Sequence, residues 1–234
     1  MGSRSTYMTI YDKVDHIKGF FSAEDVLSVI DIVDLLPDTV DILEIGSYQG
    51  RSTVAWAEAC IAANKEYSIH CIDNHDLTTG QGRKNIVALV EYYKSILAKN
   101  DVSHDIFKLF DVEKFPILVN YFENNIEGEI NFFKNTAGYN VSFEETTFTT
   151  SSFEWDSKGK MFDCIFYDAN HSYEYTFAAA KYWGQFLKPG GYMCFHDYSA
   201  FHPGVVDSLD DYYGKENIIK FYKNSSVVAI KKDV

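Results

Sequence analysis

Apolar residues follow two kinds of pattern along this chain, and each predicts one kind of element. In residues 22–36 they stand three or four positions apart, which predicts an amphipathic helix. Ser22 is a candidate N-cap for this helix, Asp25 follows three positions later, and Pro37 marks its end. Further helices are predicted at residues 52–63, 86–97, 112–122, 173–187 and 205–213.

Short apolar runs bounded by turn residues predict strands. They lie at residues 40–45, 67–73, 129–134, 162–168 and 192–197. The run Lys188-Pro189-Gly190-Gly191 is a strong breaker that should end the helix before the last of these strands. Two more runs, 218–222 and 227–230, flank Lys223-Asn224-Ser225-Ser226 and predict a hairpin.

The alternation of these strands with helices predicts an α/β fold. We expect a mostly parallel, seven-stranded sheet with helices on both faces and a C-terminal antiparallel hairpin. In such sheets ligands bind beyond the carboxyl ends of the strands. Asp73, Asp168 and the pair His196-Asp197 stand at these ends. We therefore expect their side chains to meet along one edge of the sheet.

Two segments, 76–111 and 137–160, are long for plain connections. Either could be a lid over a substrate or an insertion without function, and the apolar alternation inside 137–160 could form a small hairpin. The chain starts with Met1-Gly2-Ser3, which resembles a cloning remnant, and Met8 could be the native start. The expected division is therefore an added or disordered stretch at 1–7, an N-terminal helical segment at 8–39 and the main domain at 40–234.

The composition restricts the partners of this protein. With 234 residues, 46% of them hydrophobic, the chain can bury one substantial core. Its net charge of −13 argues against nucleic acid, because binding phosphate backbones requires clustered Lys and Arg.

The four cysteines lack Cys-x-x-Cys spacing, which disfavours a zinc or disulfide framework and fits a reducing cytoplasm. No apolar run reaches the roughly 18 residues of a membrane span. We expect a cytoplasmic protein without a membrane partner, and self-association into a homo-oligomer is compatible with its many Tyr and Phe residues.

The segment Glu44-Ile45-Gly46-Ser47-Tyr48-Gln49-Gly50-Arg51-Ser52 combines a strand that carries an acid, a glycine turn and the start of a helix. Such a turn surrounds a small molecule with backbone N–H groups, a helix N-terminus and a carboxylate, although a plain strand-to-helix turn is the alternative. Asp73, at the tip of the next strand, could accept both hydroxyls of a ribose or could be a loop acid. The candidate cofactor-binding residues are Glu44, Gly46, Ser47, Tyr48, Gly50, Ser52, Asp73 and Asn74.

Three segments in this order resemble class I S-adenosylmethionine-dependent methyltransferases, and within them the macrocin (TylF-type) O-methyltransferases. They are the glycine turn with Asp73, the run Phe-Asp-Cys-Ile-Phe-Tyr-Asp-Ala-Asn-His-Ser-Tyr at 162–173, and the run Leu-Lys-Pro-Gly-Gly-Tyr-Met-Cys-Phe-His-Asp-Tyr at 187–198. The resemblance covers residues 40–234 and implies a Rossmann-like sandwich. It also implies S-adenosylmethionine as the cofactor and a hydroxyl on a sugar of a natural product as the acceptor.

The resemblance also assigns roles within the cofactor site. It implies that Glu44 lies under the amino acid end of the cofactor and that Asp73 holds its ribose. Tyr48 stands where the usual Glu-x-Gly-x-Gly-x-Gly motif has its middle glycine. This departure disfavours a dinucleotide, whose pyrophosphate needs a close approach of the backbone.

Methyl transfer from a sulfonium requires the acceptor hydroxyl to lose its proton while it attacks the methyl carbon. His171 is a candidate general base, because an imidazole with an unperturbed pKa of about 6.5 is largely neutral at cytoplasmic pH. Asp168 stands three positions before it and is the second candidate catalytic residue. The alternative is that His171 caps the helix that follows.

A divalent cation would help a sugar hydroxyl, which is a poor acid, to lose its proton. Asp168, His196 and Asp197 offer ligands for it on adjacent strand tips. Oxygen ligands suit Mg²⁺, while the histidine leaves Mn²⁺ or Fe²⁺ open. The resembled branch has an acid where this chain has His196. A buried histidine that only positions Asp197 is therefore the alternative.

The favoured hypothesis is an S-adenosylmethionine-dependent O-methyltransferase that acts on a hydroxyl of a sugar or a sugar-containing small molecule. One alternative is a regulatory protein that keeps the cofactor fold without its chemistry. A nicotinamide-dependent oxidoreductase is a second, which Tyr48 disfavours. A hydroxylase is a third, with an iron site of His171, His196 and Asp197, but it would leave the glycine turn unexplained.

Overall fold

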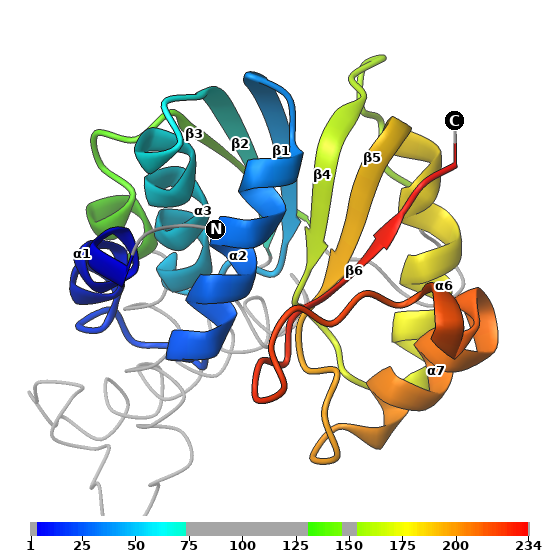
Figure 1. The fold of residues 1–234 in the computed structure, drawn as a ribbon. Helices are drawn as coiled ribbons and strands as arrows, with labels where there is room; N and C mark the ends of the chain where they lie inside the picture. The colour runs from blue at the N-terminus through cyan, green and yellow to red at the C-terminus, as the bar shows by residue number, and fades with distance from the viewer. Residues whose placement is uncertain (1–3, 74–130, 147–153, 234) are drawn as a thin grey trace, which may run out of the picture. The chain divides into compact units, whose positions relative to one another are not determined.

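The structure is a computed structural model that describes residues 4–73, 131–146 and 154–233. Within this part of the chain, six strands form one sheet in the order β3-β2-β1-β4-β5-β6 (Figure 1). The strands are β1 (Thr39–Ile45), β2 (Glu66–Asp73), β3 (Val141–Glu145), β4 (Phe162–Tyr167), β5 (Leu187–Phe195) and β6 (Val228–Lys231). Neighbouring strands are parallel except β5 and β6, which are antiparallel. The predicted α/β fold with a mostly parallel sheet is confirmed.

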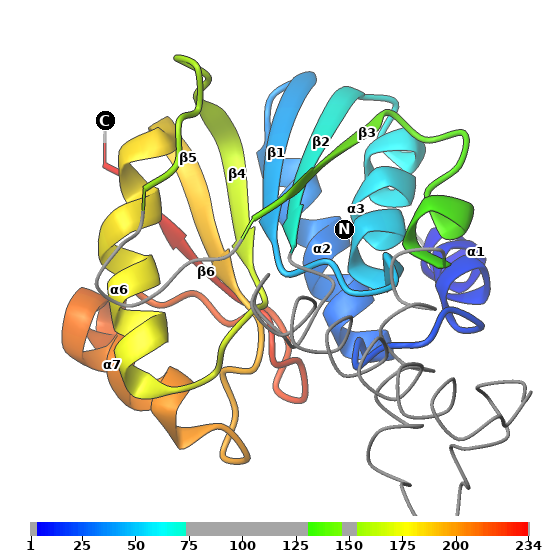
Figure 2. The ribbon, with the colours of Figure 1, turned by 180° about the vertical axis from the view of Figure 1, so that it is seen from behind.

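Helices cover both faces of this sheet (Figures 1 and 2). They are α1 (Arg4–Val14), α2 (Ala23–Leu35), α3 (Arg51–Ala62), α6 (Tyr173–Trp183) and α7 (Pro203–Tyr213), with 3₁₀ turns η2 (Gly184–Phe186) and η3 (Lys215–Asn217). Successive residues of a strand point to opposite faces. Ile42 therefore packs into one core with α1, α2 and α3, whereas Leu43 packs into the other with α6 and α7.

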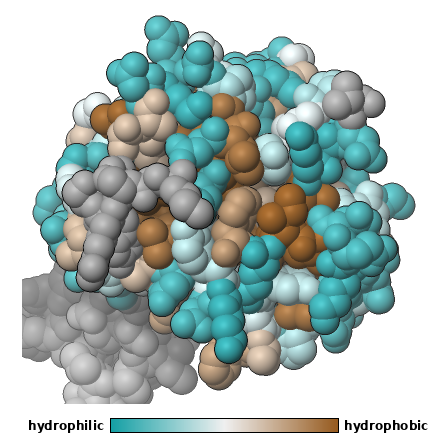
Figure 3. Space-filling view, viewed as in Figure 1, coloured by the Kyte–Doolittle hydropathy of each residue, from teal (hydrophilic) through white to brown (hydrophobic). Residues whose placement is uncertain are grey.

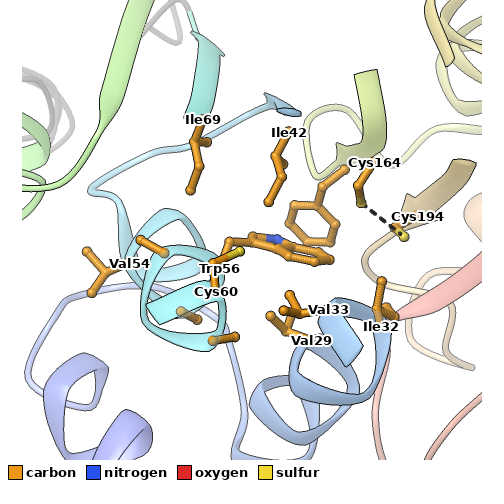
Figure 4. Packing of buried hydrophobic residues seen from close by; sticks show 14 of the residues in the cluster. Val29, Ile32, Val33, Ile42, Val54, Trp56, Cys60, Ile69, Cys164 and Cys194 are labelled. Atoms are coloured by element: carbon orange, nitrogen blue, oxygen red, sulfur yellow. Dashed lines mark hydrogen bonds between the residues drawn. The ribbon is translucent and has the colours of Figure 1, made fainter. Parts of the chain in front are cut away.

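Trp56 of α3 is the largest side chain in the first core and is fully buried. It lies between Val29 and Val33 of α2 and Ile42 of β1 (Figure 4). Burial of so large a side chain stabilises the fold by about 3 kcal/mol or more. The same packing fixes α3 against the sheet, and α3 begins where the glycine turn ends.

The amphipathic helix expected at 22–36 is confirmed together with its start and its end. The hydroxyl of Ser22 accepts from the backbone N–H of Asp25, and the Asp25 carboxylate accepts from the backbone N–H of Ser22 at 2.8 Å. This reciprocal pair is a capping box, with an acid in the position where glutamate is common. Helix α1 begins at Arg4, inside the seven residues that we expected to be added or disordered.

The strand predicted at 129–134 is wrong, because residues 131–135 are helical. The edge strand β3 is instead Val141–Glu145, in the segment expected to be a lid or a small hairpin, and it pairs in parallel with β2. Phe132 and Phe143 pack their rings 5.1 Å apart, so each apolar run places one aromatic residue against the first core. A short apolar run is compatible with a strand and with a helix, and tertiary packing decides which of the two forms.

The helix before the breaker at 188–191 ends as expected, since α6 ends at Trp183 and η2 at Phe186. The start of the next strand was predicted too late, because β5 begins at Leu187 and runs through the breaker. A register shift opposite Phe162 and Cys164 accommodates these residues. A Cβ on Gly191 would lie 2.7 Å from the carbonyl oxygen of Asp163, so the absence of a side chain lets the two strands approach.

The C-terminal hairpin is present in part. Strand β6 pairs with β5, but the run 218–222 reaches β6 only through an isolated bridge between Ile219 and Ala229. The described part of the sheet therefore has six strands where we expected seven. The helices predicted at 86–97 and 112–122 and the segment 76–111 lie outside the described residues, as does Asn74.

The face of the molecule shown in Figure 3 is mainly hydrophilic, with separate apolar areas between polar side chains. None of the helices in the described ranges combines the length and the apolar character that crossing a bilayer requires.

Candidate active site

Gly46 follows β1 directly and lets the end of this strand lie against the end of β4. A Cβ at this position would lie 2.1 Å from the carbonyl oxygen of Asp168, and the backbone has a φ of +88°. The N–H of Gly46 donates to the carbonyl of Ile72 at 2.9 Å, and the N–H of Asp168 donates to Ile45 at 2.8 Å. Only glycine meets both the space and the backbone conformation. The glycine turn therefore joins three strand ends.

Asp73 holds the glycine turn at the end of β2. Its Oδ2 accepts hydrogen bonds from the backbone N–H groups of Ser47 and Tyr48, both at 2.7 Å. Tyr48 has a φ of +44° and a side chain that is partly exposed. Asp73 thus shapes the turn itself, a role that the sequence did not indicate.

Glu44 lies beneath the turn and is fully buried. Its Oε1 accepts from the hydroxyl of Ser52 at 2.6 Å, and its Oε2 accepts from the hydroxyl of Thr53 and from Cys71 Sγ, the latter at 3.3 Å. Burial raises the pKa of Glu44 to about 7. The carboxyl group therefore supports the start of α3 from inside the core, where Gly50 is the N-cap residue.

Ser47 has a hydroxyl group that is buried in the turn. The residue is 2% exposed, and its Oγ has no hydrogen-bond partner among the described residues. A buried hydroxyl without a partner costs free energy unless a ligand or water satisfies it. This atom distinguishes Ser47 from Ser52, whose hydroxyl is used by Glu44.

Asp168, His196 and Asp197 meet at the ends of β4 and β5, as predicted. His196 Nδ1 lies 3.4 Å from Asp168 Oδ1 and 3.2 Å from Asp197 Oδ2. This nitrogen is buried, and neither contact has the angle of a hydrogen bond. Asp197 has a φ of +60°, which turns its carboxylate back toward the strand ends. One nitrogen and two carboxylates therefore face a common point.

Asp25 holds the other nitrogen of His196, a contact that the sequence did not reveal. Asp25 Oδ2 lies 3.3 Å from His196 Nε2, and Ser226 Oγ lies 2.9 Å from the same nitrogen. The Asp25 carboxylate also accepts from the Ser225 hydroxyl at 2.8 Å. His196 is thus buried, as in the alternative of a histidine that only positions Asp197, and it also faces two candidate ligands, Asp168 and Asp197.

His171 approaches the same carboxylates from the solvent side. Its Nε2 lies 2.9 Å from Asp197 Oδ2 and 3.6 Å from Asp168 Oδ1. It is not the cap of α6, because the hydroxyl of Ser172 accepts from the N–H of Tyr175 in that position. The predicted pair of catalytic residues, Asp168 and His171, is therefore brought together.

The charges of this cluster are strongly coupled. The nearby carboxylates of Asp168 and Asp197 stabilise the protonated ring and raise the pKa of His171 to about 9. Burial opposes a charge on His196, but the three carboxylates around it raise its pKa well above the usual range. The expectation that His171 is largely neutral is wrong for this arrangement, because two carboxylates stabilise its protonated form.

The pKa values of the carboxylates shift in the opposite direction. Burial would raise their pKa, but the neighbouring histidines lower the pKa of Asp168 and of Asp197. Asp25 behaves in the same way, mainly through His196. Three carboxylates thus face two imidazoles, and the cluster has an excess of negative charge.

The described residues contain two sets of side chains with the spacing of metal ligands. One is the predicted set Asp168, His196 and Asp197, and the other is His171, Asp197 and His202. The set of His171, His196 and Asp197 considered for a hydroxylase is not among them. No spacing argument in the sequence supports His202 as a ligand, because its distance from His196 along the chain matches no known ligand pattern.

A cavity of 610 Å³ lies elsewhere in the described structure. Its lining includes Leu187, Met193, Tyr213 and Ile230. It shares no residue with the cluster at the strand ends, and it therefore contributes nothing to the chemistry considered above.

Comparison with known proteins adds to this geometry. Residues 43–198 match the protein family described as "Methyltransferase domain". No match was found among curated proteins. The matched range contains the glycine turn, Asp73, Asp168 and the His196-Asp197 pair.

Solved structures with a similar fold include two O-methyltransferases. The O-methyltransferase NovP has a TM-score of 0.56 at 14% sequence identity, over 91% of this chain and 81% of that chain. The apo structure of CalS11, a TDP-rhamnose 3'-O-methyltransferase of calicheamicin biosynthesis, has a TM-score of 0.52 at 13% identity, over 99% of this chain and 96% of that chain. At this identity the likeness concerns the fold.

Proposed function

Because the chain belongs to the methyltransferase-domain family, we propose that it transfers the methyl group of S-adenosylmethionine to a hydroxyl oxygen of a small, sugar-containing molecule. The resemblance to class I S-adenosylmethionine-dependent methyltransferases is confirmed. One observation carries the proposal of hydroxyl methylation: Asp168, His171, His196 and Asp197 converge beside the glycine turn. A proton-accepting group and a candidate cation site thus lie next to the candidate cofactor site.

The proposed cofactor half consists of Gly46, Ser47, Tyr48, Gly50, Ser52 and Asp73, with Glu44 beneath it. Asn74 stays a candidate from the sequence alone. The hydroxyl of Ser47 has no partner in the described part of the chain, which supports a ligand at the turn, because a bound polar group would satisfy it. The N-terminus of α3, held by Glu44, adds a positive end of a helix dipole that suits the carboxylate of the cofactor's amino acid end. Asp73 would hold the ribose from the position in which it already orders the turn.

Asp168, His196 and Asp197 would hold a divalent cation. The fit rests on His196 Nδ1, which is buried, has no hydrogen bond to another described residue and faces both carboxylates. A donor set of one imidazole and two carboxylates suits Mn²⁺ or Fe²⁺ and, less well, Mg²⁺. Such an ion supplies Lewis-acid activation of the acceptor hydroxyl.

His171 is the proposed general base. Asp197 Oδ2 lies 2.9 Å from its Nε2 and fixes the ring, so an imidazole that carries its proton on Nε2 can take a proton on Nδ1. A raised pKa makes the neutral form a minority at pH 7, but that form is a stronger base toward a weakly acidic hydroxyl. Asp168 shares in holding the ring and the positive charge that develops on it.

The acceptor class is supported by the chemistry of the site and by the nature of similar folds. A base and a cation site together suit an acceptor that is a poor acid, such as a sugar hydroxyl. CalS11, which has the same fold, is a TDP-rhamnose methyltransferase. An acceptor of this kind brings its own hydroxyls as further ligands.

Isothermal calorimetry with S-adenosylmethionine and with its demethylated product tests the cofactor. Binding of both at micromolar concentrations supports the proposal, and the absence of heat with either contradicts it. The base is tested with His171→Gln, which should keep cofactor affinity and reduce methyl transfer to a sugar-nucleotide panel by about 100-fold or more. An unchanged rate would exclude His171 as the base.

A further inference from the structure

His202 places a second imidazole on the outer side of Asp197. Its Nε2 lies 3.4 Å from Asp197 Oδ1, while His171 Nε2 lies 2.9 Å from Asp197 Oδ2. The rings of His171 and His202 make an edge contact, with their centroids 4.8 Å apart and an interplanar angle of 62°. The three ligand atoms all lie within 4.8 Å of one another. The two histidines therefore bracket one carboxylate.

This set differs in chemistry from the set of Asp168, His196 and Asp197. Two imidazole nitrogens and one carboxylate are typical ligands of Zn²⁺ and other first-row transition metals. Around an ion with bonds of about 2.1 Å, ligand atoms are spaced by about 3.4 Å, which is the distance from Asp197 Oδ1 to His202 Nε2, while His171 Nε2 lies nearer to Oδ2 at 2.9 Å. Mg²⁺, in contrast, prefers oxygen ligands and keeps its waters.

The set is also accessible and held in place. The side chains of His171 and His202 are 40% and 36% exposed, whereas His196 is almost completely buried. The N–H of His202 donates to the carbonyl of Ser199 at 3.0 Å, and Pro203 starts α7 directly after it. An ion from solvent can therefore reach these atoms without opening the core.

We propose that His171, Asp197 and His202 form a second cation site that binds a transition metal ion such as Zn²⁺. An ion at this site inhibits methyl transfer, a consequence that rests on the proposed function of His171. A neutral imidazole has a single lone pair, so a His171 that ligates a metal through Nε2 carries its proton on Nδ1 and cannot accept another. Asp197 belongs to both donor sets, so the two ions would compete for its oxygens.

The site is tested by titrating the full chain with zinc chloride in a calorimeter. Wild-type protein should bind Zn²⁺, and His202→Gln should weaken this binding by at least about tenfold. His16→Gln is the matched control, because His16 is an exposed histidine outside both donor sets, and it should bind as the wild type does. Equal affinity of the wild type and His202→Gln, or no binding by the wild type, would overturn the proposal.

A second measurement needs no variant. One equivalent of paramagnetic Co²⁺ should broaden the ring-proton NMR signals of His171 and His202 in the wild-type protein, while those of His16 stay sharp. Broadening that spares His202 would refute the site. The titration with S-adenosylmethionine keeps the two proposals apart: zinc binding without cofactor binding contradicts the proposed function alone, and the reverse result contradicts the second site alone.

Discussion

Asp25 Oδ2 lies 3.3 Å from His196 Nε2, although the two residues are 171 positions apart and both side chains are 3% exposed. The same carboxylate caps α2 through Ser22 and accepts from the backbone N–H of Ser226 at 2.8 Å. A carboxylate behind a histidine commonly fixes the ring of a metal ligand. The first turn of helix α2 thereby contacts the candidate cation site.

Asp25→Asn should lower the free energy of unfolding by about 3 kcal/mol or more, because it removes one partner of a buried ion pair. Ser22→Ala removes a hydroxyl of the same capping box but leaves the contact with His196, and it should cost about 1 kcal/mol. Urea unfolding of the two variants and the wild type measures the difference. Equal losses would show that Asp25 acts only as a helix cap.

Gly46→Ala tests the close approach of β1 and β4. The added Cβ would meet the Asp168 carbonyl, so we expect a loss of several kcal/mol and no cofactor binding. Gly138→Ala is matched to it, because Gly138 has a φ of +90° and nothing within 4 Å of an added Cβ. Gly138→Ala should lower the free energy of unfolding by only about 1–2 kcal/mol, the cost of a Cβ in a left-handed backbone conformation. Similar unfolding free energies of the two variants would contradict the steric argument.

Glu44 predicts a specific pH dependence of stability. Its pKa rises from an ordinary value near 4.5 to about 7 on folding, so the folded state binds the extra proton between these values. The contribution of Glu44 is therefore complete below pH 4.5 and is lost as pH rises through about 7, on the order of 3 kcal/mol in total. Urea unfolding of the wild type and Glu44→Gln between pH 4 and 8 should show this fall in the wild type alone. Parallel curves would mean that Glu44 is charged in the core.

The parts of the fold that follow from local signals were predictable. Helix α2 starts after Ser22 and ends before Pro37 as expected, because a capping residue and a proline act on the few residues beside them. The run at 129–134 was misassigned, since Phe132 is buried equally well from a helix. The alternation around Val141–Glu145 allowed a strand of a small hairpin, but it did not reveal the parallel pairing of β3 with β2, which is a long-range contact.

The site shows the same division. The convergence of Asp168, His196 and Asp197 followed from the rule that ligands bind at the ends of parallel strands. The charge of His171 did not, because it depends on the distances to Asp168 and Asp197. His202 lies 3.4 Å from Asp197, whose backbone is in the left-handed conformation. No spacing in the sequence predicts this conformation.

Ser47→Ala separates a ligand-binding hydroxyl from a structural one. Because the Ser47 hydroxyl is buried without a partner among the described residues, its removal should leave the free protein as stable as before, or up to about 1 kcal/mol more stable. The same change should weaken S-adenosylmethionine binding by about tenfold if the cofactor satisfies this hydroxyl. Ser52→Ala should do the opposite in the free protein, since it removes a 2.6 Å hydrogen bond to Glu44 and destabilises the fold. Urea unfolding without ligand and calorimetry with the cofactor give both quantities for each variant. A Ser47→Ala protein that loses stability and keeps its cofactor affinity would place this hydroxyl in the structure of the turn and outside the binding site.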